Sequence, residues 1–93
     1  MDTRTHNYMV KLFKLLSNSN RLRILELLFS SKEPLTVNTI GERLNIEQSN
    51  LSNHLTRMRE NKLIKAKQDG IHMYYSLSDP NVAVILRNVT WQK

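Results

Sequence analysis

The sequence contains no cysteine, and that absence excludes several kinds of chemistry at once. Disulfide bonds, thiolate metal sites and thiol-based redox sensing all require this residue. Glycine and proline occur only twice each, and the chain has neither a low-complexity tract nor an internal repeat. We therefore expect residues 1–93 to form a single domain without an internal linker.

Long hydrophobic runs are also missing. The longest strictly apolar run extends only from Val82 to Leu86, whereas a helix that spans a bilayer needs roughly 20 apolar residues. The first residues, Met1 to Val10, lack the apolar stretch of a secretory signal peptide. The sequence predicts a soluble, cytoplasmic protein.

Acidic residues are scarce relative to basic ones. The 8 Asp and Glu residues face 14 Lys and Arg residues, which gives a net charge of +6 and an isoelectric point near 10.0. Such an excess favours an anionic partner, either nucleic acid or a membrane surface. The sequence also has no nucleophile beside a base, no phosphate-binding glycine loop and no paired carboxylates, so an enzyme is the weakest interpretation.

The hydrophobic pattern predicts helices at both ends and in the middle of the chain. Apolar residues recur every three to four positions over residues 3–17, as in an amphipathic helix. A second helix follows the capping residues 18–20; it is apolar on nearly every side and belongs at the centre of the core. A short strand is expected near residues 35–37, and Asp79-Pro80 is a typical start for a last helix, over residues 79–92.

The middle of the chain has the pattern of a helix-turn-helix at residues 37–61. Thr36 can cap a helix over residues 37–44, and Asn45 can end it because asparagine tolerates the left-handed conformation. Gly41 is small where two crossing helices must approach closely. A second helix follows from Gln48 to Asn61, and Glu47, at its expected N-cap, is not a favoured capping residue although its charge suits the helix dipole.

A β-hairpin is predicted at residues 63–77. Asp69-Gly70 is a strong signal for a two-residue turn, which would place Ala66 opposite Met73 and Ile64 opposite Tyr75. On the other face the same turn would pair Lys67 with His72 and Lys65 with Tyr74. The predicted fold is mainly α with a small β-hairpin wing, that is, a winged helix-turn-helix.

Polar residues on the second helix of the motif are candidates for reading DNA bases. In this fold that helix enters the major groove, and amide and hydroxyl groups pair with base edges. The candidates are Gln48, Ser49, Asn50, Ser52 and Asn53.

Basic residues next to that helix are candidates for contacting the DNA backbone, because phosphate contacts flank the groove. Most of them fall between residues 57 and 67, where Glu60 is the only acidic residue. The candidates are His54, Arg57, Arg59, Lys62, Lys65, Lys67 and His72.

The terminal helices are candidates for a homodimer interface, because a chain this short has little core with which to cover two apolar helix faces. The candidate residues are Tyr8, Leu12, Phe13, Val82, Ile85, Leu86, Val89 and Trp91. Trp91 could instead stack on a ligand, but an aromatic residue at helical spacing is more often part of such a seam.

Three motifs occur in the order Leu16–Leu28 (LSNSNRLRILELL), Gln48–Leu55 (QSNLSNHL) and Tyr74–Pro80 (YYSLSDP). Together they resemble the ArsR/SmtB family of winged-helix repressors over about residues 8–90, and within it the PagR-type branch. The resemblance implies a homodimer that binds an inverted-repeat operator on double-stranded DNA.

The residues by which many members of this family bind metals are absent. Thr36 and Asn38 stand where the family's thiolate site has two cysteines, and Asn81 stands two residues after Asp79 where a second site has histidine. Gln92 stands at a later ligand position of that second site. A single plausible ligand cannot hold zinc, so we expect no metal and no cofactor.

Two alternatives remain open from the sequence. A winged helix can act as a protein-interaction adaptor without touching DNA, because a fold does not fix a function. A DNA-binding protein of this kind can also sense a ligand at a site between its subunits.

Overall fold

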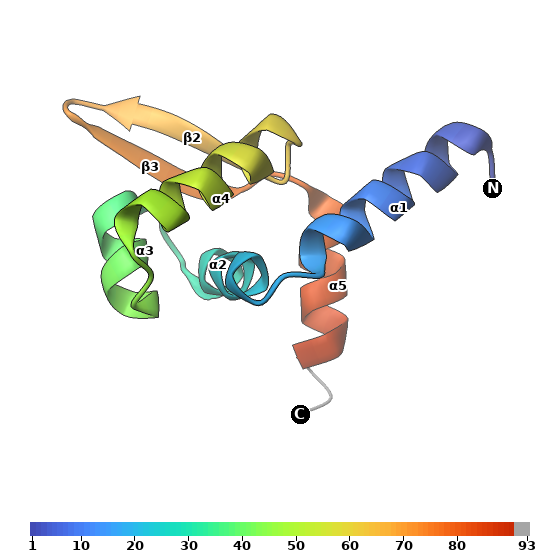
Figure 1. Cartoon of the computed structure of the whole chain (residues 1–93), viewed down its shortest axis with the longest axis horizontal. Coiled ribbons are helices and arrows are strands. Elements are labelled where there is room, and N and C mark those ends of the chain that lie inside the picture. The colour runs from blue at the N-terminus through green and yellow to red at the C-terminus, as the bar shows by residue number, and fades with distance from the viewer. Residues whose placement is uncertain (91–93) are drawn as a thin grey trace.

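The computed structural model describes residues 1–90, so Trp91 and Gln92 lie outside the described residues. Five helices and three strands follow one another along this part of the chain (Figure 1). In order they are α1 (Thr3–Leu16), α2 (Ser19–Ser30), β1 (Leu35–Thr36), α3 (Val37–Leu44), α4 (Gln48–Glu60), β2 (Ile64–Asp69), β3 (His72–Leu77) and α5 (Pro80–Thr90). This arrangement confirms the predicted winged helix-turn-helix.

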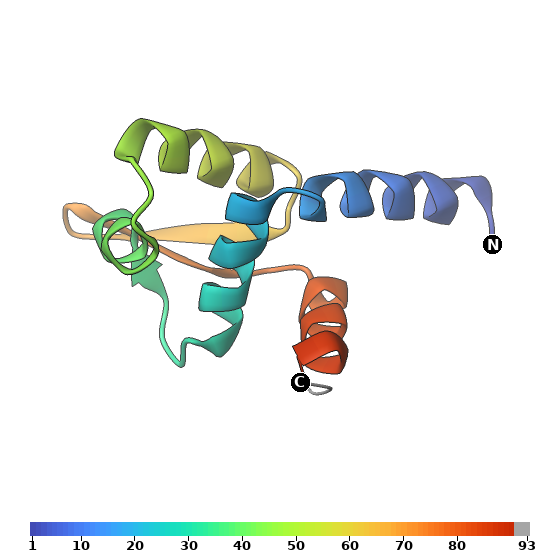
Figure 2. The same cartoon turned by 60° about the horizontal axis from the view of Figure 1, so that its bottom comes forward.

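Helix α2 lies at the centre of the molecule, as its apolar sequence predicts. Ile24 and Leu25 are fully buried, and α4 lies across α2 (Figure 2). The helix begins where Asn18 caps it, since the side-chain oxygen accepts a hydrogen bond of 3.0 Å from the backbone N–H of Arg21. The core around α2 consists of Leu12, Leu15, Leu28, Ile40, Ile46, Leu51, Leu55, Met58, Leu63, Ile64, Val82 and Leu86.

The predicted hairpin is present, but its predicted register is wrong. Ala66 lies opposite Tyr75 and Ile64 opposite Leu77, while Lys67 lies opposite Tyr74 and Lys65 opposite Ser76. The turn is formed by Gly70 and Ile71, with a positive φ of 64° at Gly70. A turn with glycine in its first position needs a positive φ only there, whereas an Asp-Gly turn would also need one at the aspartate.

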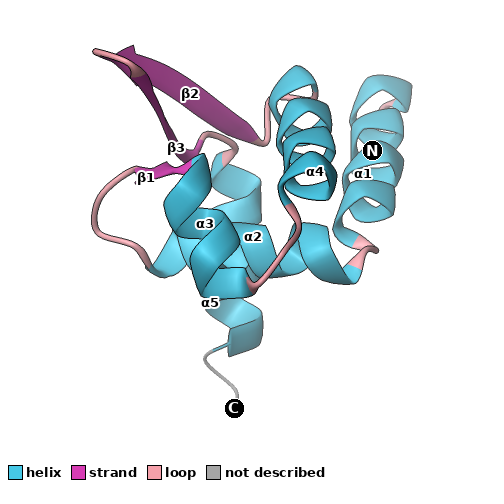
Figure 3. Cartoon of the chain, turned by 60° about the vertical axis from the view of Figure 1, so that its left-hand side comes forward, coloured by secondary structure: helices cyan, strands magenta, loops and turns pink. Residues whose placement is uncertain are grey.

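The register error leaves the two faces of the hairpin unchanged, because it amounts to two residues and side chains alternate with a period of two. The lysines therefore still share one face with Tyr74, and His72 lies at the tip of that face opposite Asp69. Strand β1 pairs with β3 to complete a three-stranded sheet of order β1-β3-β2. The two longer strands project as a wing beyond the helices (Figure 3).

The terminal helices lie together at the end of the molecule away from the tip of the wing. The second half of α1 packs on the core through Leu12 and Leu15, whereas its first half extends away from the body (Figures 1 and 2). The side chain of Asp79 caps α5 by accepting a 2.8 Å hydrogen bond from the N–H of Asn81. Within the described residues, no helix is both long and apolar enough to cross a membrane.

Candidate nucleic-acid interface

The turn between α3 and α4 brings the two helices close together. Asn45 ends α3 in the left-handed conformation with φ 54°, as its sequence position predicts. A Cβ added at Gly41 would lie 3.3 Å from the Leu51 side chain and 3.5 Å from the carbonyl oxygen of Ile46. The absence of a side chain at Gly41 therefore permits the crossing that presents α4 to solvent.

The outer face of α4 carries the candidate base-reading residues on its first two turns. All five of these side chains are exposed, while Leu51, Leu55 and Met58 of the same helix are buried. The candidates are Gln48, Ser49, Asn50, Ser52 and Asn53. The helix thus offers a continuous surface of amides and hydroxyls that no other element covers.

Two residues of α3 adjoin this surface and are not evident from the sequence. Asn38 and Glu42 line a hollow of about 230 Å³ between α3 and α4, and Gln48 lines it from the other side. The helical spacing of α3 identifies its apolar face but not its orientation toward α4. Only the crossing of the two helices brings these side chains beside Gln48.

Glu47 caps α4 more completely than its residue type suggests. Its carboxylate accepts hydrogen bonds from the N–H groups of Ser49, at 3.1 Å, and Asn50, at 3.0 Å. The Ser49 hydroxyl donates to the same carboxylate, so that this donor is not available to a base. The hydrogen bond from the Ser49 side chain and those from the two backbone N–H groups lower the pKa of Glu47.

This cap predicts a loss of stability in acid. A carboxylate whose pKa is lowered by folding contributes stability above its usual pKa of 4.5, and that contribution disappears as the pH falls through the lowered pKa. We expect Glu47→Gln to melt at a lower temperature than the wild type at pH 7, and the difference to vanish toward pH 3. Thermal melts at several pH values measure it. Glu42→Gln, which removes a carboxylate that caps no described helix, is the control and should show no such convergence; parallel curves for Glu47→Gln would contradict the prediction.

Most of the candidate backbone-contacting residues lie on the exposed surface between the end of α4 and the wing. Arg57 and Arg59 belong to the last turn of α4, and Lys62 follows in the left-handed conformation with φ 62°. Lys65 and Lys67 are exposed on one face of β2. His72 is exposed at the tip of that face, and its ring meets the Tyr74 ring edge-on at 6.3 Å.

His54 differs from the other members of this set because it is half-buried. Burial lowers its pKa, and the nearby charge of Arg21 lowers it further. The imidazole is therefore neutral at pH 7 and could meet a phosphate only through a hydrogen bond. The guanidinium of Arg21 is itself held by a 2.8 Å hydrogen bond to the carbonyl oxygen of Leu15.

The candidate dimer residues divide into two groups. Leu12, Val82 and Leu86 are buried in this chain's own core, at 3%, 0% and 4% exposure. Tyr8, Phe13 and Val89 are exposed, while Ile85 is half-buried. The exposed large apolar side chains of the described residues are Met1, Tyr8, Val10, Phe13, Ile71, Val84 and Val89, and all but Ile71 belong to the two terminal segments.

Comparisons with known proteins agree with this architecture. Residues 16–65 match a family model described as a helix-turn-helix domain. The transcriptional repressor PagR of Bacillus anthracis is 35% identical over 83% of this chain and 76% of that protein. The transcriptional activator HlyU of Vibrio cholerae is 32% identical over 83% of this chain and 69% of that protein.

Solved structures give the same result. The crystal structure of PagR superimposes with a TM-score of 0.85 and 28% identity, covering 95% of this chain and 99% of PagR. The solution structure of a homodimeric winged helix-turn-helix domain, Mb0332 of Mycobacterium bovis, a possible ArsR-family regulator, superimposes with a TM-score of 0.81 and 24% identity. It covers 97% of this chain and 84% of that domain, and at this identity the likeness concerns the fold.

Proposed function

The chain belongs to the ArsR/SmtB family of winged helix-turn-helix transcriptional regulators, and from this premise we propose that it is a repressor that binds an inverted-repeat operator as a homodimer. The observation that carries the proposal is the exposed polar surface on the first two turns of α4, which lies beside a basic wing. A second helix of this kind enters the major groove, and the phosphates on either side are contacted by basic residues.

The proposed contacts divide into two kinds. Gln48, Ser49, Asn50, Ser52 and Asn53 read base edges, because amides pair with adenine in two places and hydroxyls pair with several bases. Arg57, Arg59, Lys62, Lys65, Lys67 and His72 contact phosphates, and neutral His54 adds at most a hydrogen bond. Glu47 occupies the N-terminus of α4, where a phosphate could otherwise bind, so the cationic side chains carry the phosphate contacts.

The proposed dimer uses the exposed apolar residues of α1 and α5. Exposed apolar side chains that gather on two elements mark an interaction surface, and in a twofold dimer the same patch meets itself. Tyr8, Phe13, Ile85 and Val89 would form the contact, with Val10 and Val84 added to it. Leu12, Val82 and Leu86 support this surface from within the chain's core. A homodimer places two α4 helices for the two halves of an inverted repeat.

We further propose that the protein has no enzymatic activity, binds no resident metal or cofactor and works in the cytoplasm. Thr36, Asn38 and Asn81 stand at the family's metal-binding positions, and none of them is a good zinc ligand. The relatives found are transcription regulators. Occupation of a promoter is enough for repression, whereas activation needs a further contact with the transcription machinery.

Substitutions on α4 are expected to change sequence discrimination. Asn50→Ala or Gln48→Ala should cost roughly 1–3 kcal/mol on the operator and little on random DNA, because a side chain that pairs with a base edge contributes only where the correct base is present. The operator is first isolated from genomic fragments that the purified protein retains. The measurement is the ratio of the two affinities at fixed salt.

Lys67→Ala is the matched control, because removal of a phosphate-binding side chain should weaken binding to both DNAs equally. If Asn50→Ala and Gln48→Ala also weaken both equally, these side chains position the protein and do not read the sequence. If no DNA fragment is retained at all, the protein is an adaptor and the proposal is wrong.

A further inference from the structure

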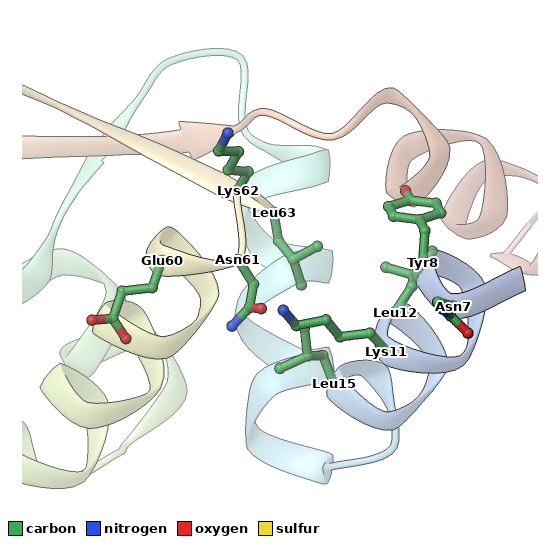
Figure 4. A pocket seen from close by; sticks show the side chains of 9 residues that line it. All are labelled: Asn7, Tyr8, Lys11, Leu12, Leu15, Glu60, Asn61, Lys62 and Leu63. Atoms are coloured by element: carbon green, nitrogen blue, oxygen red, sulfur yellow. The ribbon is translucent and has the colours of Figure 1, made fainter. Parts of the chain in front are cut away.

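A hollow lies where α1 meets the end of α4 and the start of the wing. It has a volume of about 360 Å³, which is within the range of small-molecule sites. Its walls come from α1, from the last residue of α4 and from the loop that leads to β2 (Figure 4). The lining residues are Asn7, Tyr8, Lys11, Leu12, Leu15, Glu60, Asn61, Lys62 and Leu63.

The hollow has an apolar floor and a positively charged wall. Leu12, Leu15 and Leu63 are buried beneath it. The ammonium group of Lys11 extends across it toward the Asn61 amide, whereas the carboxylate of Glu60 and the ammonium of Lys62 point away (Figure 4). A ligand in the hollow would therefore meet a cation and an amide above a hydrocarbon surface.

The hollow also touches the elements that would bind DNA and form the dimer. The hydroxyl of Tyr8 donates a hydrogen bond to Asp79, the cap of α5, and accepts one of 3.2 Å from the amide of Asn81. On the other side, Asn61 ends α4 through a backbone hydrogen bond of 3.2 Å from its N–H to the carbonyl oxygen of Arg57. Lys62, next in the chain, is one of the residues proposed to bind phosphate.

We propose that this α1–α4 hollow binds a small amphipathic carboxylate, which acts as an effector that releases DNA. The apolar body of such a ligand covers the leucine floor, and its carboxylate pairs with Lys11 and Asn61 in a charge-assisted contact. The bound carboxylate places a negative charge beside the residues proposed to bind phosphate, so it weakens the attraction to DNA. The regulatory part rests on the proposed function; the binding part does not.

A second copy of this chain is a less suitable occupant than a carboxylate. The exposed apolar residues that would form a dimer seam, such as Phe13 and Val89, do not line the hollow. Lys11 and the two asparagines, Asn7 and Asn61, do line it, and charged residues such as lysine are depleted at the cores of subunit interfaces. The charge of the wall thus favours a small anion over an apolar protein surface.

The test is calorimetric titration of the purified full chain without DNA, with octanoate as the probe. Octanamide has the same shape without the charge and is the matched ligand. We expect octanoate to bind at least about tenfold more tightly than octanamide, since the contact with Lys11 is charge-assisted. Lys11→Gln should remove that difference, and Lys14→Gln, a lysine of the same helix that does not line the hollow, should keep it.

Filling the hollow provides a second, independent variant. Asn7→Trp starts from an exposed residue on the wall, so it should block octanoate binding while circular dichroism shows an intact fold. In a separate step, octanoate should weaken operator binding by the wild type at least about tenfold and leave Lys11→Gln unaffected.

Three results would overturn the site whether or not the protein binds DNA: no saturable heat with millimolar octanoate, equal affinity for octanoate and octanamide, or an unchanged affinity in Lys11→Gln. If Asn7→Trp abolishes both octanoate binding and the dimer, the hollow belongs to the subunit interface and the proposal is wrong. If octanoate binds but leaves operator affinity unchanged, the site is not an effector site.

Discussion

Raising the salt concentration from 50 to 200 mM is expected to weaken operator binding by about 10³-fold to 10⁵-fold. Neutralised phosphates release their counterions, so the logarithm of affinity falls linearly with the logarithm of salt, with a slope of about −0.9 per neutralised phosphate. Arg57, Arg59, Lys62, Lys65 and Lys67 are all exposed along the end of α4 and the wing. In a homodimer this set occurs twice, which reaches the range of about six to ten neutralised phosphates for which such an effect is typical.

Single substitutions assign this salt dependence to the wing. Lys65→Ala or Lys67→Ala should each reduce the slope by about one unit, on operator and random DNA alike, if the lysine neutralises a phosphate. Lys32→Ala is the matched control, because Lys32 is exposed but lies in the loop after α2. Affinities measured by fluorescence anisotropy at four or more salt concentrations decide it. An affinity that does not depend on salt would rule out a phosphate-binding surface.

The second large effect concerns two neighbouring residues of α5 that differ in burial. Leu86 is 4% exposed, so Leu86→Asp would place an unpaired charge in the core of the single chain. We expect a decrease of roughly 3–5 kcal/mol or more in the free energy of unfolding, which is a large part of the stability of a typical small domain.

Val89, one turn later, is 62% exposed and belongs to the proposed seam. Val89→Asp should leave the fold intact and weaken the dimer at least about tenfold, because the twofold axis places the same charge on both subunits. Circular dichroism reports the fold, and sedimentation reports a mass of 10.9 kDa or twice that value. A folded dimer for both variants would show that α5 contributes neither core nor seam in the manner described.

Much of the fold was predictable from the sequence because it is encoded locally. The caps of α2 and α3, Asn18 and Thr36, precede periodic apolar residues, and the side chains accept the expected hydrogen bonds. Asn45 takes the left-handed conformation that its position between two helices requires. Periodicity likewise separated the buried face of α4 from its exposed polar face.

The hairpin register was the main error, and its cause is also local. Asp69-Gly70 and Gly70-Ile71 are both compatible with a two-residue turn around one glycine, and the choice depends on which backbone angles the strands impose. Pairing of β3 with β1, which sets Leu35 opposite Tyr75, adds a constraint from a distant segment. The faces were nevertheless correct, since a shift of two residues does not exchange them.

The sequence by itself determined the order of elements, the family, and the exposed polar face of α4 with its basic neighbours, because each depends on residue type and short-range spacing. Only the tertiary structure decided which apolar residues of α1 and α5 are core and which are free for a partner, since both kinds share the same helical periodicity. It also joined Tyr8 to Asp79, and Lys11 to the end of α4. These groups lie far apart along the chain, and packing, not local propensity, brings them together.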